Sequence, residues 1–378
     1  MNGYLQGSFG RYRSRVSGLP EFGGELPVSV LAEEIETPGP GRIRALVTSA
    51  GNPVLSTPNG ARLERELESL DFMVSIDMYL NETTRHADII LPPTSALEHD
   101  HYDLAFYLVS VRNIANYSPA VFERTGDQRH DWEICAELAS RMETSEKPWG
   151  RAVGKLARAA ALRVGPRGAL DAGLRLGPYK RLSLKKLESQ PHGIDLGPLQ
   201  PRLPGALQTP DGTLHLAPDL YLGDLPRLRA RLRSAEAAGD GALVLIGRRH
   251  LRSNNSWMHN SQRLVKGKQR CTLLMNPSDA ATRGLTDGAR VTVTSRAGAV
   301  TAPLEVSDEM MPGVVSLPHG WGHDRTGARL RVAAEHAGVS VNDVTDEQFY
   351  DALTGTAGLS GVTVKVAAAA AGELADAS

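Results

Sequence analysis

Two groups of polar residues in this sequence have the types and spacing of a ligand-binding site. The first begins at Gly51 and Asn52, directly after the apolar run of residues 43–48. A glycine lets the backbone approach a ligand closely, and an asparagine side chain both donates and accepts hydrogen bonds. Asp77 ends the next apolar run, and Asp88 opens the one after it. Acids at such positions accept hydrogen bonds from a ribose hydroxyl or a guanine edge, although a plain turn with two solvated acids fits the same residues.

The second group is a dense polar stretch that follows the apolar run of residues 242–246. So many arginine, histidine and asparagine side chains beside one tryptophan indicate a loop around a polar, anionic ligand, rather than only an exposed loop. The residues are Arg248, His250, Arg252, Ser253, Asn254, Asn255, Ser256, Trp257, His259 and Asn260.

Other candidate sites are weaker. Residues 98–101 (Glu-His-Asp-His) crowd one loop without the spacing of metal ligands, and we expect them to be solvated. His319 and His323 are four residues apart, but the two glycines between them argue against a helix that would align them. No phosphate-binding glycine motif and no nucleophile elbow occurs.

Alternating strands and helices place the first group. We expect helices over 25–36 and 59–70 and strands over 43–48, 72–77 and 88–91, which is the order of a parallel α/β sheet. Because open α/β sheets bind ligands beyond the carboxyl ends of their strands, Gly51 and Asn52 would lie at such an edge.

The sequence beyond this sheet changes character twice. Residues 105–111 look extended, and residues 131–142 look like a helix with an apolar stripe that includes Cys135. From residue 147 to about 240, Pro, Gly, Leu and Arg predict an irregular connection with short helices and a tight turn at 210–212. The last third has short β-like runs at 242–246, 272–275, 291–294, 301–306 and 314–317, with Gly298 in a hairpin turn, which favours a compact barrel.

Bulk composition limits the functions further. The formal net charge is -1, from 42 basic and 43 acidic residues, so charge alone directs the protein to neither nucleic acid nor an anionic membrane. No run is apolar enough to span a bilayer, and no secretory signal is visible in residues 1–15. We therefore expect a cytoplasmic protein without direct membrane insertion. The only cysteines, Cys135 and Cys271, are too few for an iron–sulfur cluster and are expected to be reduced.

Two long runs closely resemble the third domain of the dimethyl sulfoxide reductase family of molybdopterin oxidoreductases: ALVTSAGNPVLSTPNG and FMVSIDMYLNETTRHADIILPPTSALEHD. Four later runs resemble that family's dinucleotide-binding fourth domain, a double-psi β-barrel: LIGRRHLRSNN, LLMNPSDAATRGLTDGARVTVTSRAG, VVSLPHGWG and VSVNDVT. The runs PHGIDLG and TPDG resemble its connecting segment. The resemblance covers most of the chain, in the right order.

The resemblance implies a division of the chain and a cofactor. Residues 1–40 would be the remnant of a preceding catalytic domain, 41–146 an α/β dinucleotide-binding domain, 147–240 the connection, 241–368 the double-psi β-barrel and 369–378 a tail. The cofactor would be molybdenum, or tungsten, bis(molybdopterin guanine dinucleotide). Residues carried over as its ligands are Gly51, Asn52, Asp77, Thr83 and Asp88 for one guanosine, Arg248, His250, Arg252, Ser253, Asn254 and Trp257 for the pterin and phosphates, and Asn342 for the second dinucleotide.

The family pattern also has parts that this sequence does not show. Members resembling this chain begin with a cysteine-bound iron–sulfur module, followed by a domain that supplies a metal ligand, and neither cysteine here matches that ligand. The resemblance therefore implies the cofactor-binding C-terminal part of a formate dehydrogenase- or nitrate reductase-like enzyme, with an N-terminal half or subunit as partner. A non-catalytic pterin-binding protein or a truncated gene product is the alternative. Formate, an N- or S-oxide and an oxyanion all stay open as substrates.

Overall fold

The protein is described by a computed structural model that places residues 9–142, 148–179, 181–237 and 241–370. It forms two compact units. One contains Met1–Ser75, Tyr79–Ile90 and His215–Ser378, and the other contains Ile76–Met78 and Leu91–Leu214. These bounds differ from the division expected from the resemblance, because the first α/β elements and the C-terminal barrel share one unit.

The first unit begins with short elements around a small sheet. β4 and β5 are parallel and β3 borders β4, as the sequence predicted for this sheet. An antiparallel pair, β1 and β2, precedes the sheet. The elements are β1 (Phe9–Arg13), β2 (Pro20–Phe22), η1 (Val28–Val30), α1 (Leu31–Glu36), β3 (Ala45–Ser49), α2 (Pro53–Ser56), α3 (Gly60–Leu67), β4 (Phe72–Ile76), η2 (Thr84–His86) and β5 (Ile89–Ile90).

The core of this α/β part is formed by one face of each helix. Ile35 of α1 packs with Leu63 and Leu67 of α3 and with Met73 of β4, and all four are almost fully buried. Asn59 caps α3 from a left-handed backbone conformation, and its side chain accepts a hydrogen bond from the backbone N–H of Arg62. The turn after β3 and the loop after β4 are thereby fixed at one side of this core.

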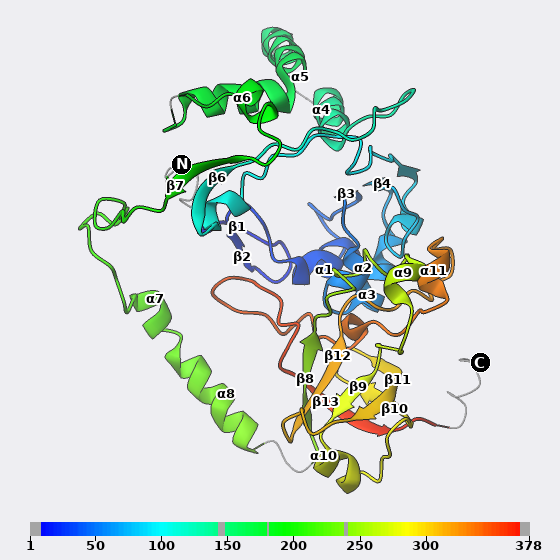
Figure 1. Cartoon of the computed structure of the whole chain (residues 1–378). Helices are drawn as coiled ribbons and strands as arrows, with labels where there is room; N and C mark the ends of the chain where they lie inside the picture. The colour runs from blue at the N-terminus through cyan, green and yellow to red at the C-terminus, as the bar shows by residue number, and fades with distance from the viewer. Residues whose placement is uncertain (1–8, 143–147, 180, 238–240, 371–378) are drawn as a thin grey trace. The chain divides into compact units, whose positions relative to one another are not determined.

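The C-terminal region is a closed six-stranded barrel, in the order β10-β11-β9-β12-β8-β13 (Figure 1). Its strands are β8 (Leu243–Arg248), β9 (Leu273–Met275), β10 (Arg290–Thr294), β11 (Ala299–Val306), β12 (Val314–Pro318) and β13 (Val362–Ala368). Short helices lie between or before them: α7 (Asp219–Leu222), α8 (Leu225–Ala237), α9 (Gln262–Val265), α10 (Pro277–Thr282), α11 (Arg331–Ala334) and η4 (Val341–Asp343).

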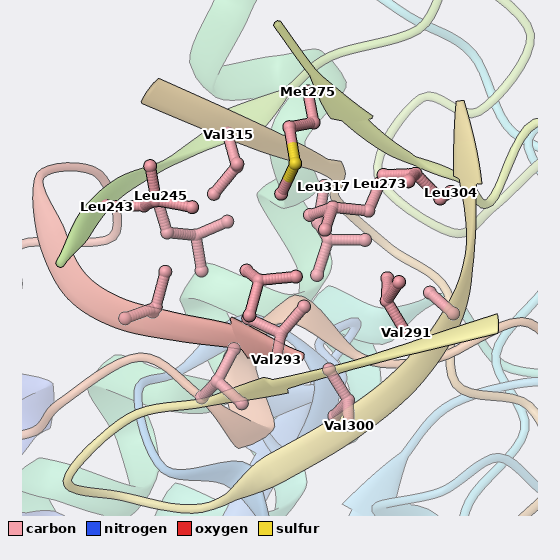
Figure 2. Packing of buried hydrophobic residues seen from close by; sticks show 14 of the residues in the cluster. Leu243, Leu245, Leu273, Met275, Val291, Val293, Val300, Leu304, Val315 and Leu317 are labelled. Carbon is pink, nitrogen blue, oxygen red and sulfur yellow. The ribbon is translucent and has the colours of Figure 1, made fainter. Parts of the chain in front are cut away.

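Alternation along each strand fills the barrel. Leu243 and Leu245 of β8 point inward, whereas Val244 between them is 41% exposed. The inward side chains meet in one apolar cluster that includes Met275 and Val293 (Figure 2). Burial of each such side chain contributes roughly 1.5–3 kcal/mol, so the alternation of inward and outward side chains stabilises the barrel. The expected combination of an α/β sheet and a compact barrel is thus confirmed.

The second unit has its own small core. β6 (Arg112–Ala115) pairs antiparallel with β7 (Ile194–Pro198). Around them lie η3 (Phe106–Val109), α4 (Asp131–Met142), α5 (Pro148–Leu176, kinked at Gly165) and α6 (Leu184–Glu188). The cluster of buried residues is Ala115, Tyr117, Leu174, Leu182, Leu184 and Leu187.

Several expectations from the sequence are wrong here. Residues 106–109 form a 3-10 helix instead of an extended segment. The buried face of α4 is centred on Ile134, while Cys135, expected on the apolar stripe, is exposed. The connection contains the 29-residue α5 rather than short helices alone, because alanine, leucine and arginine favour helix despite the glycines. Ala367 and Ala368 pair with β10, so the last strand ends where the tail expected at 369–378 begins. Residues 371–378 of that tail lie outside the described residues.

Both cysteines are free thiols in the structure. Two turns that the sequence predicted are confirmed. The turn at 210–212 closes with a hydrogen bond from the Gly212 N–H to the Thr209 carbonyl, and Gly298 lies in the β10–β11 hairpin. Within the described residues no helix is both long and apolar enough to cross a membrane.

Candidate functional site

Side chains of the loop after β4 form hydrogen bonds with the turn after β3. Asn52 donates from Nδ2 to Glu82 Oε2 at 2.7 Å and accepts at Oδ1 from the Thr83 hydroxyl, also at 2.7 Å. Thr83 in turn accepts a hydrogen bond from the backbone N–H of Val54. The structure therefore brings together two predicted site residues, Asn52 and Thr83, and adds a carboxylate that sequence reasoning had not singled out.

Glu82 continues this hydrogen-bond chain into the barrel region. Its Oε1 lies 2.8 Å from His323 Nδ1, and His323 Nε2 lies 2.9 Å from His259 Nδ1. The His259 ring stacks on Trp321, with ring centroids 4.0 Å apart. Glu82 and His259 are 0% exposed and His323 is 2% exposed. A buried polar chain thus links the α/β strand ends with two loops that adjoin the barrel.

The environment sets the charges in this chain. Burial raises the pKa of Glu82, but the hydrogen bond and charge of His323 outweigh it, so the pKa is lowered and the carboxylate is charged. Burial, helped by the charge of His323, lowers the pKa of His259 to about 3. His259 is therefore neutral near pH 7, and the buried Glu82 carboxylate faces the His323 ring at hydrogen-bond distance.

Glycines make the close packing of the two loops possible. A Cβ on Gly320 would lie 2.0 Å from the Asn255 carbonyl oxygen, and one on Gly322 would lie 2.8 Å from Ser340 Cβ. Both glycines also have positive φ, at 92° and 111°. The loop that carries Trp321 and His323 can therefore lie against the loop of residues 249–260 only with glycine at position 320, and against Ser340 only with glycine at position 322.

The predicted residues of the polar loop divide into two groups. Arg248 and Ser253 point inward: Arg248 donates to the Ser316 and Thr272 carbonyls at 3.0 Å, and Ser253 is 2% exposed. His250, Arg252, Asn254 and Trp257 lie at the surface, Trp257 being 69% exposed. His250 Nδ1 accepts the Arg252 N–H at 3.0 Å, and Asn254 has a φ of 41°. These four exposed residues form a polar surface on the loop that also carries the buried His259.

Asn342 and Asp88 make internal contacts. Asn342 is 0% exposed; its Nδ2 donates to the Leu55 carbonyl at 2.7 Å, and its Oδ1 accepts from the Thr345 hydroxyl. Asp88 Oδ2 accepts the Met73 N–H at 2.7 Å, and so helps to pair β5 with β4. Gly51 is half-buried beside Asn52, and Asp77 follows β4 directly. Cofactor contacts of these residues stay predictions.

An ionic cluster lies next to the same loops. Glu64 of α3 pairs with Arg85 and with Arg325, and Arg325 also bonds Asp343 Oδ2 at 2.6 Å. Burial raises the pKa of Glu64, but His86, Arg325 and Arg85 together lower it to about 2. Burial raises the pKa of Asp343 in spite of Arg325. These pairs hold α3 against the segment that follows β12.

Two side chains of the loop of residues 98–101 make internal hydrogen bonds while staying partly exposed. Asp100 bonds the Tyr117 hydroxyl and Arg167, and Glu98 accepts the Ser95 N–H at 2.7 Å. Over the described part of the chain, no three His, Cys, Asp or Glu side chains gather as metal ligands. The loop is thus held by structural hydrogen bonds.

Sequence reasoning passed over the residues that join the site. His259 was one of ten polar residues in a loop, His323 was set aside for its glycine neighbours, and Glu82 was only part of a quoted run. Glu82 and His323 are 241 residues apart, so no local pattern connects them. The available signal was position: Glu82 directly precedes the predicted Thr83.

Three buried polar atoms in these loops make no hydrogen bond within the described residues: His259 Nε2, Trp321 Nε1 and Ser253 Oγ. The Gly320 backbone lies near His259 and favours its charged form, without forming a bond to Nε2. Buried polar groups are normally satisfied by protein, water or ligand, so these atoms are candidate contacts for a polar ligand. Donors and a hydroxyl beside exposed arginines suit a heterocycle with phosphates, so the residues present fit a pterin dinucleotide.

Comparisons with known proteins agree with this arrangement. Residues 10–141 match the model of the family described as "Molybdopterin oxidoreductase", and residues 243–363 match that of the "Molydopterin dinucleotide binding domain". The probable oxidoreductase YoaE of Bacillus subtilis is 25% identical over 86% of this chain and 44% of its own length. The dimethyl sulfoxide/trimethylamine N-oxide reductase of Cereibacter sphaeroides is 25% identical over 73% of this chain and 35% of its own.

A solved structure shows the same fold. Acetylene hydratase from Pelobacter acetylenicus superposes with a TM-score of 0.65 at 20% identity, over 90% of this chain and 46% of that one. The chain thus spans less than half the length of these relatives. Both family models match in the order that the resemblance implied, and the chain belongs to the dimethyl sulfoxide reductase family of molybdopterin oxidoreductases.

Proposed function

We propose that this chain is the cofactor-binding C-terminal part of a molybdenum or tungsten oxidoreductase that uses molybdopterin guanine dinucleotide, with a formate dehydrogenase- or nitrate reductase-like reaction. One observation carries the proposal. The three unbonded buried atoms, His259 Nε2, Trp321 Nε1 and Ser253 Oγ, belong to loops that the Glu82–His323 pair ties to the α/β strand ends.

The residues of this chain would divide the binding between them. Asn52, held by Thr83, keeps one amide N–H and one lone pair of Oδ1 beyond its bonds to Glu82 and Thr83, and these would face the guanosine end. Arg252 and His250 would face the phosphates from the surface of the loop. His259, Trp321 and Ser253 would bind the pterin. The bound metal centre supplies two-electron chemistry, and the protein supplies binding, orientation and charge. We also propose that the closed barrel has double-psi topology.

We further propose that an N-terminal half or subunit provides the metal ligand and covers part of the second unit. Large apolar side chains lie exposed there, Phe106 at 72% and Val111 at 90%. Such a set is larger than the single exposed apolar residues that are normal on soluble proteins. Its members are Leu104, Phe106, Leu108, Val109, Val111, Val121 and Phe122.

Titration of molybdopterin guanine dinucleotide, released anaerobically from a purified molybdoenzyme, tests the main proposal. Arg252→Ala removes one charge-assisted bond, worth about 1.5–3 kcal/mol, and should weaken binding about ten- to a hundredfold. Arg229→Ala, at an exposed position of α8, is the matched control and should bind like wild type. Equal affinity in all three proteins, or no binding by wild type, would contradict the proposal. Asp88→Ala is a poorer choice because Asp88 bonds the Met73 backbone.

A further inference from the structure

Large apolar side chains are exposed at high density between residues 216 and 232, in the unit that also contains the barrel. Seven of them have exposed fractions between 38% and 92%. Scattered single apolar residues are normal on a protein surface, but a dense set of them indicates an interaction surface. They belong to α7, to α8 and to the segment before these helices (Figure 1). The residues are Leu216, Leu220, Tyr221, Leu222, Leu225, Leu228 and Leu232.

The leucines of α8 form one apolar stripe, and its arginines flank that stripe on both sides. Successive residues of an α-helix are about 100° apart, so Leu225, Leu228 and Leu232 lie within about 60° of the helix circumference. Arg229 lies about 70° from the centre of the stripe on one side, and Arg231 lies about 90° from it on the other. Because α8 has four arginines and one glutamate, it is a cationic helix with one apolar face.

Arginines, and not leucines, attach α8 to the rest of its unit. Arg231 Nη2 donates to the Gly361 carbonyl at 3.1 Å, and its guanidinium lies 4.3 Å from the centroid of the Phe349 ring. Arg227 pairs with Asp351 at 3.5 Å. None of the three apolar clusters in the described part of the chain includes a leucine of the stripe. A short helix gains most of its stability from the packing of its apolar face, so the stripe is a surface for an occupant outside these clusters.

The charges around the stripe identify the kind of occupant. Arg229 and Arg233 are exposed, and neither forms an ion pair or a hydrogen bond with the residues that the structure describes. Asp224, the acid that directly precedes the helix, is held by Arg227 at 2.6 Å. Both free charges on the described side chains of α8 are therefore positive, and they are complementary to an anionic surface.

Two further features favour a lipid surface over a groove in a protein. The side chains of residues 225–233 are exposed on every side of the helix, and the apolar positions continue into α7 with Leu220, Tyr221 and Leu222. The apolar surface is thus longer than one helix. On a bilayer, leucines enter the boundary of the acyl chains, arginine side chains extend to the headgroup phosphates, and tyrosine is favoured between the two zones.

We propose that α7 and α8 form a docking surface for an anionic lipid bilayer, with the leucine stripe in the interface and Arg229 and Arg233 at the headgroup phosphates. The helix lies along the bilayer surface and does not cross it, because α8 is short and carries four arginines. Within the described residues no helix is long and apolar enough to span a membrane. The proposal does not depend on the proposed cofactor site. Each free arginine should increase the affinity for anionic lipid about fivefold.

Sedimentation of the full-length chain with lipid vesicles tests this surface. One set of vesicles contains phosphatidylglycerol and phosphatidylcholine in equal parts, and the other contains phosphatidylcholine alone. The chain should bind the mixed vesicles, and it should bind the uncharged vesicles roughly twentyfold more weakly because two arginines lose their partners. Added salt should weaken binding to the mixed vesicles by screening. Equal binding to both kinds of vesicle, or binding to neither, would overturn the proposal.

Two double variants separate the apolar part of the surface from its charges. Leu228→Gln with Leu232→Gln keeps good helix formers and should weaken binding to the mixed vesicles at least about tenfold, because two apolar side chains no longer enter the bilayer. Arg229→Gln with Arg233→Gln should weaken that binding roughly twentyfold and should leave binding to phosphatidylcholine unchanged. The arginine variant decides the proposal even if circular dichroism shows that the leucine variant has lost helix. Unchanged binding by the arginine variant would contradict the proposal.

Two single variants are the matched controls. Met311→Gln removes an exposed apolar side chain and Arg329→Gln an exposed charge elsewhere in the same unit, and both should bind the mixed vesicles like wild type. Weaker binding by either control, as large as that of the double variants, would place the contact elsewhere and overturn the proposal. Absence of vesicle binding by wild type, together with weaker self-association of the leucine variant, would show that a second copy of the chain covers the stripe, and would overturn it as well.

Discussion

The interior of the barrel and the seam beside it bury opposite kinds of side chain within one compact unit. The cluster that fills the interior consists of apolar residues such as Leu245, Leu273 and Met275. We define the seam as the set of hydrogen bonds and ion pairs that link the α/β part to the segments following β8 and β12. It consists of the Glu82–His323–His259 chain, the Glu64–Arg325–Asp343 pairs and the hydrogen bond from Asn342 to Leu55. Apolar burial has no direction, whereas hydrogen bonds and charges do. The barrel therefore supports the site, and the seam provides its chemistry.

The largest effect should come from the barrel interior. Leu245→Ala removes a fully buried side chain and should lower the free energy of unfolding by about 2–5 kcal/mol, through lost burial and a cavity. Val244→Ala, one residue away on the outer face of β8, should cost less than about 1 kcal/mol. Chemical denaturation of both variants measures the difference. Similar losses of unfolding free energy in the two variants would contradict the inward position of Leu245 and the outward position of Val244.

The seam should respond to charge rather than to volume. Arg325→Gln leaves Asp343 buried without its cation and should cost about 1–3 kcal/mol at pH 7. The cost should shrink at low pH, because burial already raises the pKa of Asp343 and loss of Arg325 would raise it further, so that the acid is neutralised. Arg329→Gln, at an exposed position, is the control and should be neutral. A loss for Arg325→Gln that is the same at pH 5 and pH 8 would contradict the ionic seam.

Acid should weaken the seam within a defined window. His259 has a folded pKa of about 3 against an ordinary value near 6.5, so between these values the unfolded chain binds a proton that the folded chain does not. Stability should therefore fall as the pH decreases, by up to ~1.4 kcal/mol per pH unit for this one proton. The lowered pKa of Glu82 adds a further loss below its ordinary range. His259→Asn should flatten the slope in urea titrations and His336→Asn, at an exposed site, should not; equal slopes would refute the buried neutral ring.

The smallest effect on stability should come from the exposed apolar residues of the second unit. Phe106→Ser should change the free energy of unfolding by less than about 0.5 kcal/mol and should reduce self-association of the isolated chain, measured by light scattering. Leu187→Ala, in the core of the same unit, should instead cost about 2–5 kcal/mol. A large loss for Phe106→Ser would mean that this side chain stabilises the unit itself and is no surface for a partner.

The sequence predicted the parts of the fold that have a local signature. Alternating apolar residues marked five of the six barrel strands, but β13 was missed because valines give way to alanines at its end. The helix α5 was missed because Gly165 and Pro166 interrupt its pattern. Asn52 and Thr83 were predicted on separate grounds, and the structure bonds them to each other. The Glu82–His323–His259 chain depends on tertiary contact between distant segments, which no spacing along the sequence reveals.

Amide hydrogen exchange with and without molybdopterin guanine dinucleotide tests the division between seam and barrel most directly. The account predicts slower exchange on binding in residues 249–260 and 319–323 and in the turn at 51–54. The amides of β9, β10 and β11 should keep their rates, because the interior of the barrel contacts no ligand. Unchanged exchange in the loops, or the same protection spread evenly over the barrel strands, would contradict the account.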